Sequence, residues 1–132
     1  MTFDAETLVL AYVSAWNEHD PMRCRALVDQ CWSPNAEVFG PNTHCIGREA
    51  LLAEIGRFHR ERPGERGILT SGIDCHHDFA RFTAAILNAR GELLAEAVDI
   101  AEIGPDGLLS RIVTFWGPPP QVPTTWPAAL IG

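Results

Sequence analysis

The chain has 132 residues, 46% of them hydrophobic and 20% charged, a composition typical of one globular domain with a single core. Its formal net charge of −7 argues against nucleic acid as a partner, because phosphate backbones are bound by basic surfaces. The same charge disfavours an anionic membrane surface. A small neutral ligand or a basic protein partner is compatible with this charge.

The cysteines and histidines show no spacing typical of a metal site, and there is no CxxC pair. The first residues, MTFDAETLVL, lack the basic and apolar regions of a secretion signal, and no apolar run is long enough to span a bilayer. We therefore expect a cytoplasmic protein with reduced cysteines, no metal and no cofactor; two disulfides stay open as an alternative. The residues concerned are Cys24, Cys31, Cys45 and Cys75, and His19, His44, His59, His76 and His77.

Helical periodicity dominates the first half of the chain. Asp4 is a suitable N-cap for a first helix, Pro21 suits the start of a second, and Pro63 ends a third. Leu8, Tyr12 and Trp16 recur every four positions and face one way. We predict helices over residues 4–16, 22–32 and 47–62, with a short strand over 33–41 and a loop before the third helix.

From residue 68 the hydrophobic period becomes two, which is typical of strands. Gly107 after Asp106 is a strong signal for a hairpin turn. Helices followed by a run of strands predict an α+β domain over residues 1–117, with helices covering one face of a bent antiparallel sheet. Residues 118–132 are proline-rich; they either cover a cavity mouth, lie on a partner subunit, or form a mobile tail. The predicted strands span residues 68–76, 79–88, 93–103 and 109–116.

The strand LLAEAVDIAEI, residues 93–103, has a carboxylate on its apolar face. Asp99 falls in a row that is otherwise made of alanine, leucine and isoleucine, while Glu96 and Glu102 fall on the opposite face. We expect Asp99 to point inward, where loss of water raises the pKa of a carboxyl group. Such a group can exchange protons near neutral pH. The alternative is that Asp99 caps a turn or pairs with an arginine.

Three segments together resemble the SnoaL-like branch of the nuclear-transport-factor-two-like superfamily. They are AYVSAWNEHDPMRCRALVDQCWSPNAEVFGP, GREALLAEI and AEAVDIAEIGPDGLLSRIVTFWG, so the resemblance spans roughly residues 5–117. It implies a cone, in which a curved antiparallel sheet wraps a pocket that three helices close, and often a dimer. That superfamily contains cyclases, isomerases, dehydratases, epoxide hydrolases and binding modules, so the fold alone does not define the function.

Matching residues to these enzymes narrows the chemistry that the resemblance implies. In the related ketosteroid isomerases a tyrosine of the first helix and a protonated aspartic acid form an oxyanion hole, and Tyr12 and Asp99 fall at the matching places. The general base of those enzymes is an aspartate just before a proline on the first strand. Here Phe39 and Gly40 precede Pro41, which argues against the steroid-isomerase reaction.

Two other branches of the superfamily differ in their carboxylates. Limonene-type epoxide hydrolases use an Asp-Arg-Asp arrangement with the arginine two places from an aspartate on one strand. Ala97 and Ala101 flank Asp99 instead, so that pattern is absent. SnoaL-like polyketide cyclases use a single aspartic acid for acid–base work on an enolisable carbon. A lone Asp99 fits the cyclase pattern best.

A pocket needs a wall as well as a polar group. If the cone is open, its wall consists of aromatic and aliphatic side chains, with alanines leaving space between them; the alternative is a filled core. From DCHHDF, residues 74–79, we expect a histidine, His76, to enter the pocket and exchange a proton with Asp99, or else to lie at a solvated strand end. The expected wall residues are Trp16, Trp32, Val38, Ile55, Phe58, Phe82, Ile86, Ile112, Thr114 and Trp116.

The sequence therefore favours a small cofactor-independent enzyme with catalytic residues Asp99, Tyr12 and His76. It would act on a hydrophobic carbonyl compound by moving a proton next to the carbonyl, leading to isomerisation, cyclisation or dehydration. The alternative is a non-catalytic module that binds a ligand or dimerises. We expect a homodimer through the convex sheet face, where Arg81 and Arg111 can pair with Glu96 and Glu102 within or between subunits.

Overall fold

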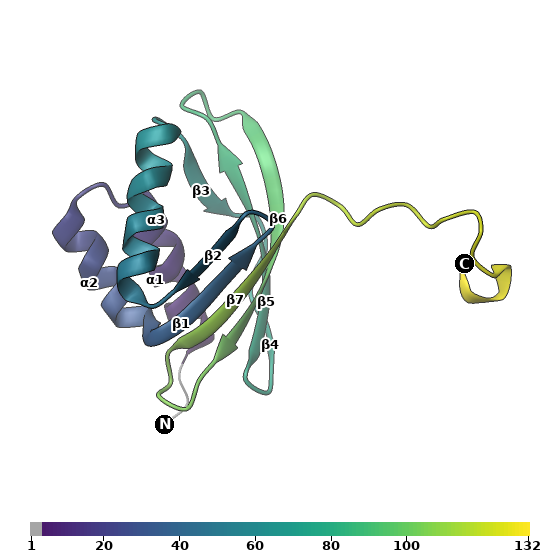
Figure 1. Cartoon of the computed structure of the whole chain (residues 1–132), viewed down its shortest axis with the longest axis horizontal. Coiled ribbons are helices and arrows are strands. Elements are labelled where there is room, and N and C mark those ends of the chain that lie inside the picture. The colour runs from purple at the N-terminus through teal and green to yellow at the C-terminus, as the bar shows by residue number, and fades with distance from the viewer. Residues whose placement is uncertain (1–3) are drawn as a thin grey trace.

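The computed structural model describes residues 4–132 (Figure 1). Two helices are followed by two strands, a third helix and then the remaining strands. The helices and a single sheet form an α+β fold, which confirms the predicted class. The helices are α1 (Ala5–Asn17), α2 (Pro21–Cys31) and α3 (Arg48–Glu61), with a 3₁₀ turn η1 (Ala128–Leu130) near the end of the chain. The strands are β1 (Trp32–Gly40), β2 (Thr43–Ile46), β3 (Arg66–Leu69), β4 (Asp74–His76), β5 (Phe79–Leu87), β6 (Leu93–Ile103) and β7 (Leu109–Trp116).

The strands form one curved sheet in the order β2-β1-β7-β6-β5-β3, and β4 pairs with the end of β5. The sheet is mixed, because β1 runs parallel to β7 while the other pairs are antiparallel. The expectation of a wholly antiparallel sheet was therefore wrong at this pair. Strand periodicity shows which residues share a face, but it carries no information about a partner that lies more than seventy residues along the chain.

Two further differences lie at strand edges. Residues 43–46, predicted as loop, form β2, which pairs with β1 so that Gly40 lies opposite Thr43 across a tight turn. The predicted strand 68–76 is two strands, because residues 70–73 leave the regular ladder. The Ser71 hydroxyl there accepts a hydrogen bond from the Thr83 amide at 2.8 Å and replaces a backbone partner.

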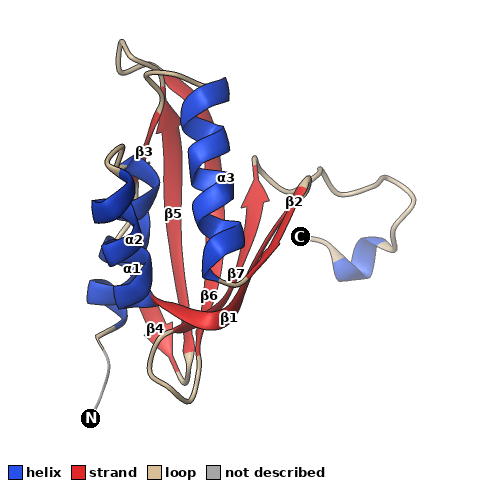
Figure 2. Cartoon of the chain, turned by 60° about the vertical axis from the view of Figure 1, so that its left-hand side comes forward, coloured by secondary structure: helices blue, strands red, loops and turns tan. Residues whose placement is uncertain are grey.

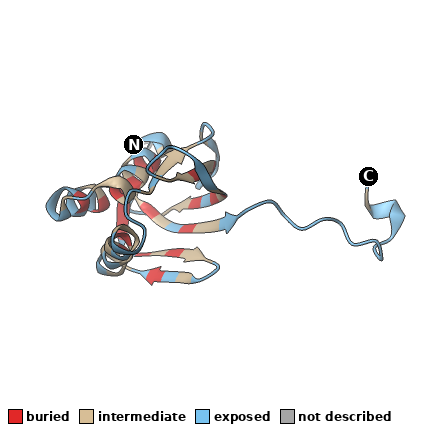
Figure 3. Ribbon diagram, turned by 90° about the horizontal axis from the view of Figure 1, so that it is seen from above, coloured by how far each residue is buried: buried red, intermediate tan, exposed pale blue. Residues whose placement is uncertain are grey.

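The helices lie against the concave face of the sheet, and the core lies between the two layers (Figures 2 and 3). Register shifts in β1, β5 and β6 bend the strands around the helices, since an extra residue on one strand locally increases its twist. The core residues come from all three helices and from β1, β2, β5, β6 and β7. The largest fully buried side chains are Val9, Val28, Cys31, Trp32, Leu51, Ile55, Phe82, Leu109 and Ile112.

One side chain joins the end of α1 to the edge of the sheet. The Asn17 amide donates to the Gly67 carbonyl at 2.8 Å and accepts from the Gly67 amide at 2.9 Å, as a second β-strand would. These two bonds hold β3 against α1, fifty residues apart in sequence. Asn17 therefore fixes one wall of the space enclosed by the helices and the sheet.

We expect Asn17→Ala to lower the free energy of unfolding by about 1–3 kcal/mol, because both Gly67 backbone groups lose a partially buried partner. Urea denaturation followed by circular dichroism measures the change. Asn42→Ala, in the exposed turn between β1 and β2, is the matched control and should change the free energy by less than about 0.5 kcal/mol. Equal losses in both variants would show that the α1–β3 clamp adds nothing.

Candidate functional site

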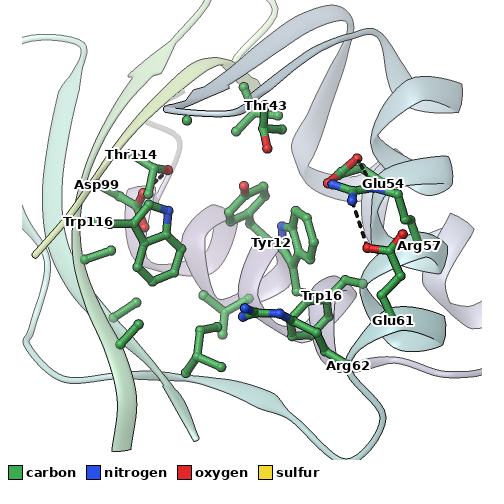
Figure 4. A pocket seen from close by; sticks show the side chains of 18 residues that line it. Tyr12, Trp16, Thr43, Glu54, Arg57, Glu61, Arg62, Asp99, Thr114 and Trp116 are labelled. Atoms are coloured by element: carbon green, nitrogen blue, oxygen red, sulfur yellow. Dashed lines mark hydrogen bonds and ion pairs between the residues drawn. The ribbon is translucent and has the colours of Figure 1, made fainter.

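A cavity of about 470 Å³ lies between α1, α3 and the concave face of the sheet (Figure 4). Most of its wall is apolar, and its polar side chains gather in two places. Asp99, Tyr12, Thr114 and Thr43 form an inner group, while charged residues of α3 form a rim. The wall consists of Tyr12, Val13, Trp16, Val38, Gly40, Thr43, Glu54, Arg57, Phe58, Glu61, Arg62, Ala84, Ile86, Ala95, Ala97, Asp99, Thr114 and Trp116.

Asp99 lies in the middle of β6, and the pleat of the strand turns its side chain toward the concave face. Its neighbours across the sheet are Phe82 on β5 and Thr114 on β7. Only 7% of the residue is exposed, and the Thr114 hydroxyl donates a hydrogen bond to its Oδ1. The carboxyl group therefore has one fixed oxygen, and its other oxygen has no such bond in the described part of the chain.

Burial raises the pKa of Asp99 from its usual value of 3.8 to about 6, and the hydrogen bond from Thr114 opposes part of that rise. With a pKa of about 6, roughly one Asp99 in ten carries a proton at pH 7. Both the acid and the base forms are thus populated under ordinary conditions. This is the property that a proton carrier needs.

Tyr12 faces the same space from α1. Its ring stacks on Trp32 with centroids 5.5 Å apart and meets the edge of Trp16 at 6.4 Å, so it has little freedom to turn. Burial first, and then the charge of Asp99, raise the pKa of the Tyr12 hydroxyl well above its ordinary range. The hydroxyl stays protonated and points into the cavity, where it can donate a hydrogen bond to a ligand oxygen (Figure 4).

The rim of the cavity is an ion network on one face of α3. The Arg57 guanidinium donates to Glu54 through Nε at 3.1 Å and to Glu61 through Nη1 at 2.9 Å. Arg62, one residue past the helix, donates to Glu65 at 3.3 Å. These rim residues were not predicted from the sequence, although their spacing of three and four residues on a predicted helix is typical of ion pairs on one helix face.

The structure brings together eight of the predicted site residues around the cavity: Tyr12, Trp16, Val38, Phe58, Ile86, Asp99, Thr114 and Trp116. Four other predicted wall residues lie outside it, in the core at the closed end of the cone. They lie on the same face of their strand or helix as the wall residues. That face runs from the closed end of the cone to its open end, and periodicity does not show how far along it a residue lies. These four are Trp32, Ile55, Phe82 and Ile112.

His76 does not reach the cavity either, so the expectation that it enters the pocket needs correction. It lies on β4, an edge strand of three exposed residues, and its Nδ1 is 3.1 Å from Nδ1 of His77. The neighbouring Asp74 pairs with Arg81 at 2.6 Å on the outer face of the sheet. The pairing of β4 with β5 places His76 opposite Phe79 and Asp74 opposite Arg81, so both side chains lie on the outer face of the sheet.

Within residues 4–132 no three His, Cys, Asp or Glu side chains gather closely enough to hold a metal ion. No helix in this part of the chain is long and apolar enough to cross a membrane. All four cysteines are unpaired, and three of them are buried. Among the described residues that line the cavity, Asp99 is the one carboxyl of the inner group, whereas Glu54 and Glu61 lie at the rim and are paired with Arg57.

Neither the protein-family models nor the curated proteins contain a match to this chain. Several solved structures do match it. A proposed isomerase of the SnoaL-like family from Agrobacterium tumefaciens has a TM-score of 0.80 and 29% identity over 85% of this chain and 96% of its own. A proposed polyketide cyclase from Sinorhizobium meliloti has a TM-score of 0.65 and 16% identity over 82% and 93%. TsrD from Streptomyces laurentii has a TM-score of 0.65 and 21% identity over 86% and 90%.

The chain is thus similar in fold and in sequence to a structure of the SnoaL-like family, which confirms the resemblance predicted from the sequence. Two solved proteins of unknown function with a cystatin-like fold, 15% and 14% identical to this chain, share the fold as well. The two lower-identity structures support the fold only.

We expect Thr114→Val to raise the pKa of Asp99 above 6, because the variant removes the hydrogen bond that favours the charged form and keeps the burial. Carboxyl carbon NMR titration measures the pKa directly. Thr114→Ser keeps the hydroxyl and should leave the pKa close to the wild-type value. Equal pKa values in all three proteins would contradict the role of this hydrogen bond.

The raised pKa also has a cost for stability. The native state binds the Asp99 proton more tightly than the unfolded chain does, so stability falls as the pH rises from about 4 through about 6. The full cost above that window is on the order of 3 kcal/mol. We expect Asp99→Asn to raise the free energy of unfolding by about 1–3 kcal/mol at pH 8 and to give no gain below pH 3.5.

Urea denaturation at the two pH values tests this expectation. Asp78→Asn, an exposed aspartate between β4 and β5, serves as the control and should change stability little at either pH. A pH-independent effect of Asp99→Asn would mean that the native carboxyl titrates like an exposed one.

Proposed function

We propose that this protein is a cofactor-independent enzyme that moves a proton next to the carbonyl group of a small hydrophobic molecule. The carrying observation is a carboxyl group with a pKa of about 6, buried in a cavity of about 470 Å³ that also holds the Tyr12 hydroxyl. The SnoaL-like isomerase from Agrobacterium supports the same class of chemistry. Isomerisation, cyclisation and dehydration all begin with this proton transfer.

The first step uses Asp99 as its ionised base. Its carboxylate takes a proton from the carbon next to the carbonyl; the electron pair of that C–H bond forms the C=C bond of an enolate, and the π pair of the carbonyl moves to its oxygen. Tyr12 donates a hydrogen bond to this oxygen as negative charge develops there. Because its own pKa is raised far above neutrality, Tyr12 donates without giving up its proton.

The second step returns the proton. Protonated Asp99 delivers it to a different carbon in an isomerisation or to a leaving hydroxyl group in a dehydration. In a cyclisation the enolate carbon attacks a second carbonyl of the same molecule, and Asp99 protonates the new alkoxide. Each route restores the ionised Asp99 and needs no second acid–base residue.

The cavity wall supports a hydrophobic substrate with at least one ring. Trp16, Phe58 and Trp116 supply flat aromatic surface, and the small side chains Ala84 and Ala97 leave room beside them. Apart from Asp99, the charged groups of the wall lie at the rim, on α3 and just past its end, so the buried portion of the substrate is neutral.

A second candidate function is a non-catalytic pocket of the same fold. It is favoured by the strand position just before Pro41, where Gly40 lines the cavity and related ketosteroid isomerases carry a second carboxylate. A protein that only binds its ligand needs no base there.

We also propose a cytoplasmic homodimer that associates through the outer face of the sheet. The buried, unpaired thiols suit a reducing compartment. Outward-facing apolar side chains stay exposed there, at 49% for Leu94, 36% for Ile100 and 60% for Phe115. Arg111 lies 4.0 Å from Glu102 on this face, whereas Arg81 pairs with Asp74 rather than with a glutamate.

Exchange of deuterium into 2-tetralone, a hydrophobic ketone with acidic C–H bonds, tests the enzyme against the binding module. We expect catalysed exchange to fall by about 10²–10⁴ in Asp99→Asn and by about 10–10³ in Tyr12→Phe. The rate should rise with pH and reach half its maximum near pH 6, since the ionised base is required. Proton NMR in D₂O follows the exchange.

Asp78→Asn provides the matched control and should exchange at the wild-type rate. Saturable binding of the ketone without any Asp99-dependent exchange would favour the binding module instead.

A further inference from the structure

The segment GPPPQVPTTWPAALIG, residues 117–132, has a composition unlike that of a solvated tail. It contains no charged residue and five of the ten prolines of the chain. Its apolar side chains are exposed, at 51% for Val122, 55% for Trp126 and 78% for Leu130. Segments that stay disordered in water are rich in charge and poor in aromatic residues, so this composition indicates a segment that becomes covered.

The chain cannot easily cover this segment itself. Gly117 adopts a φ of +75°, and three consecutive prolines follow it, so the chain leaves β7 in a stiff extended conformation. It runs away from the sheet on the side opposite the helices (Figures 1 and 3). Nine residues of extended chain at about 3.1 Å each place Trp126 up to about 28 Å from Gly117.

The outer face of the sheet carries a second hollow, of about 370 Å³, that the proposed reaction does not use. Phe79 and Ile100 give it apolar surface, and both are exposed, at 45% and 36%. Arg81 and Asp74 form an ion pair at its edge. The hollow is lined by Asp74, His76, Phe79, Ala80, Arg81 and Ile100.

This hollow has the chemistry that recognises an indole. A tryptophan ring offers a flat apolar face to Phe79 and Ile100, and a guanidinium such as that of Arg81 is attracted to the same face. The indole N–H needs an acceptor, and the Asp74 carboxylate lies at the rim. Trp126 is the exposed tryptophan of the outgoing segment, and it is free to enter such a site on another molecule.

We infer that residues 117–132 form an arm that docks on the outer sheet face of a second copy of this chain, with Trp126 seated between Phe79 and Ile100. Each chain has both an uncovered arm and an uncovered hollow. In a two-fold dimer the arm of each chain therefore covers the hollow of the other. Two copies that each carry a charge of −7 repel each other, and an uncharged arm adds contact without adding to that repulsion. The inference is independent of the proposed catalysis, but it rests on the proposed homodimer through the outer face of the sheet.

Sedimentation of the full chain over a range of concentrations tests the arm. We expect a dimer whose dissociation constant rises on the order of 10- to 100-fold in Trp126→Asp, because an aromatic anchor is replaced by a charge. Thr125→Asp adds the same charge to the neighbouring exposed position and should change the constant less than about 3-fold. Both substitutions lie outside the folded core, so neither prevents folding.

A peptide of residues 117–132 then locates the docking site. We expect it to bind the full-length Trp126→Asp protein, whose own arm is disabled, with one peptide per chain by fluorescence anisotropy. Adding Ile100→Asp should abolish the binding, while Val98→Asp, two residues along the same outer row of β6, should preserve it.

Three results would overturn the inference. The first is that the full chain stays monomeric. The second is that Trp126→Asp weakens the dimer no more than Thr125→Asp does. The third is that the peptide does not bind, or that it still binds after Ile100→Asp.

Discussion

The loss of water around one carboxyl group sets the acid–base chemistry available in the cavity. Asp99 lies between strands that bury it, and one hydroxyl, from Thr114, offsets part of the energetic cost. A better-solvated Asp99 would be an ordinary ion, and one without Thr114 would hold its proton more firmly. The pairing of β6 with β7 places the two side chains opposite each other, so the sheet register itself sets the acidity.

The space between the sheet and the helices is filled at one end and open at the other. At the closed end Trp32, Phe82 and Ile112 fill the space between the layers, and their burial supplies much of the hydrophobic stabilisation. At the open end the facing positions are Ala84, Ala95 and Ala97, which leave the cavity. The residues that stabilise the fold and those that line the cavity therefore lie in successive parts of one continuous concave face, and Asp99 lies at the boundary between them.

The sequence predicted those features that depend on local pattern. The alternation in residues 93–103 placed Asp99 on the apolar face, the four-residue repeat of Tyr12 and Trp16 aligned them, and Gly107 marked the final hairpin. Features that depend on pairing between distant parts of the chain could not be predicted from the sequence. The parallel neighbours β1 and β7, the depth of Phe82 within the cone and the outward side of His76 follow from which strand lies beside which, and periodicity does not contain that information.

The inner part of the cavity holds a single carboxyl, because Glu54 and Glu61 lie at the rim and are paired with Arg57, and this restricts which reactions the cavity can serve. Where two carboxylates are present, one can donate a proton while the other accepts one, and water can be activated separately. In the proposed reaction the proton that Asp99 removes is the proton that it must return, so the two sites of transfer have to lie within reach of the same oxygen. Reactions that rearrange one bound molecule meet this condition, because both sites belong to the same substrate. Hydrolysis of a bound ester or epoxide would in addition require a water molecule to be held next to the same carboxyl group, in a part of the cavity whose wall is mostly apolar. The single inner carboxyl therefore favours rearrangement within one molecule over attack by water.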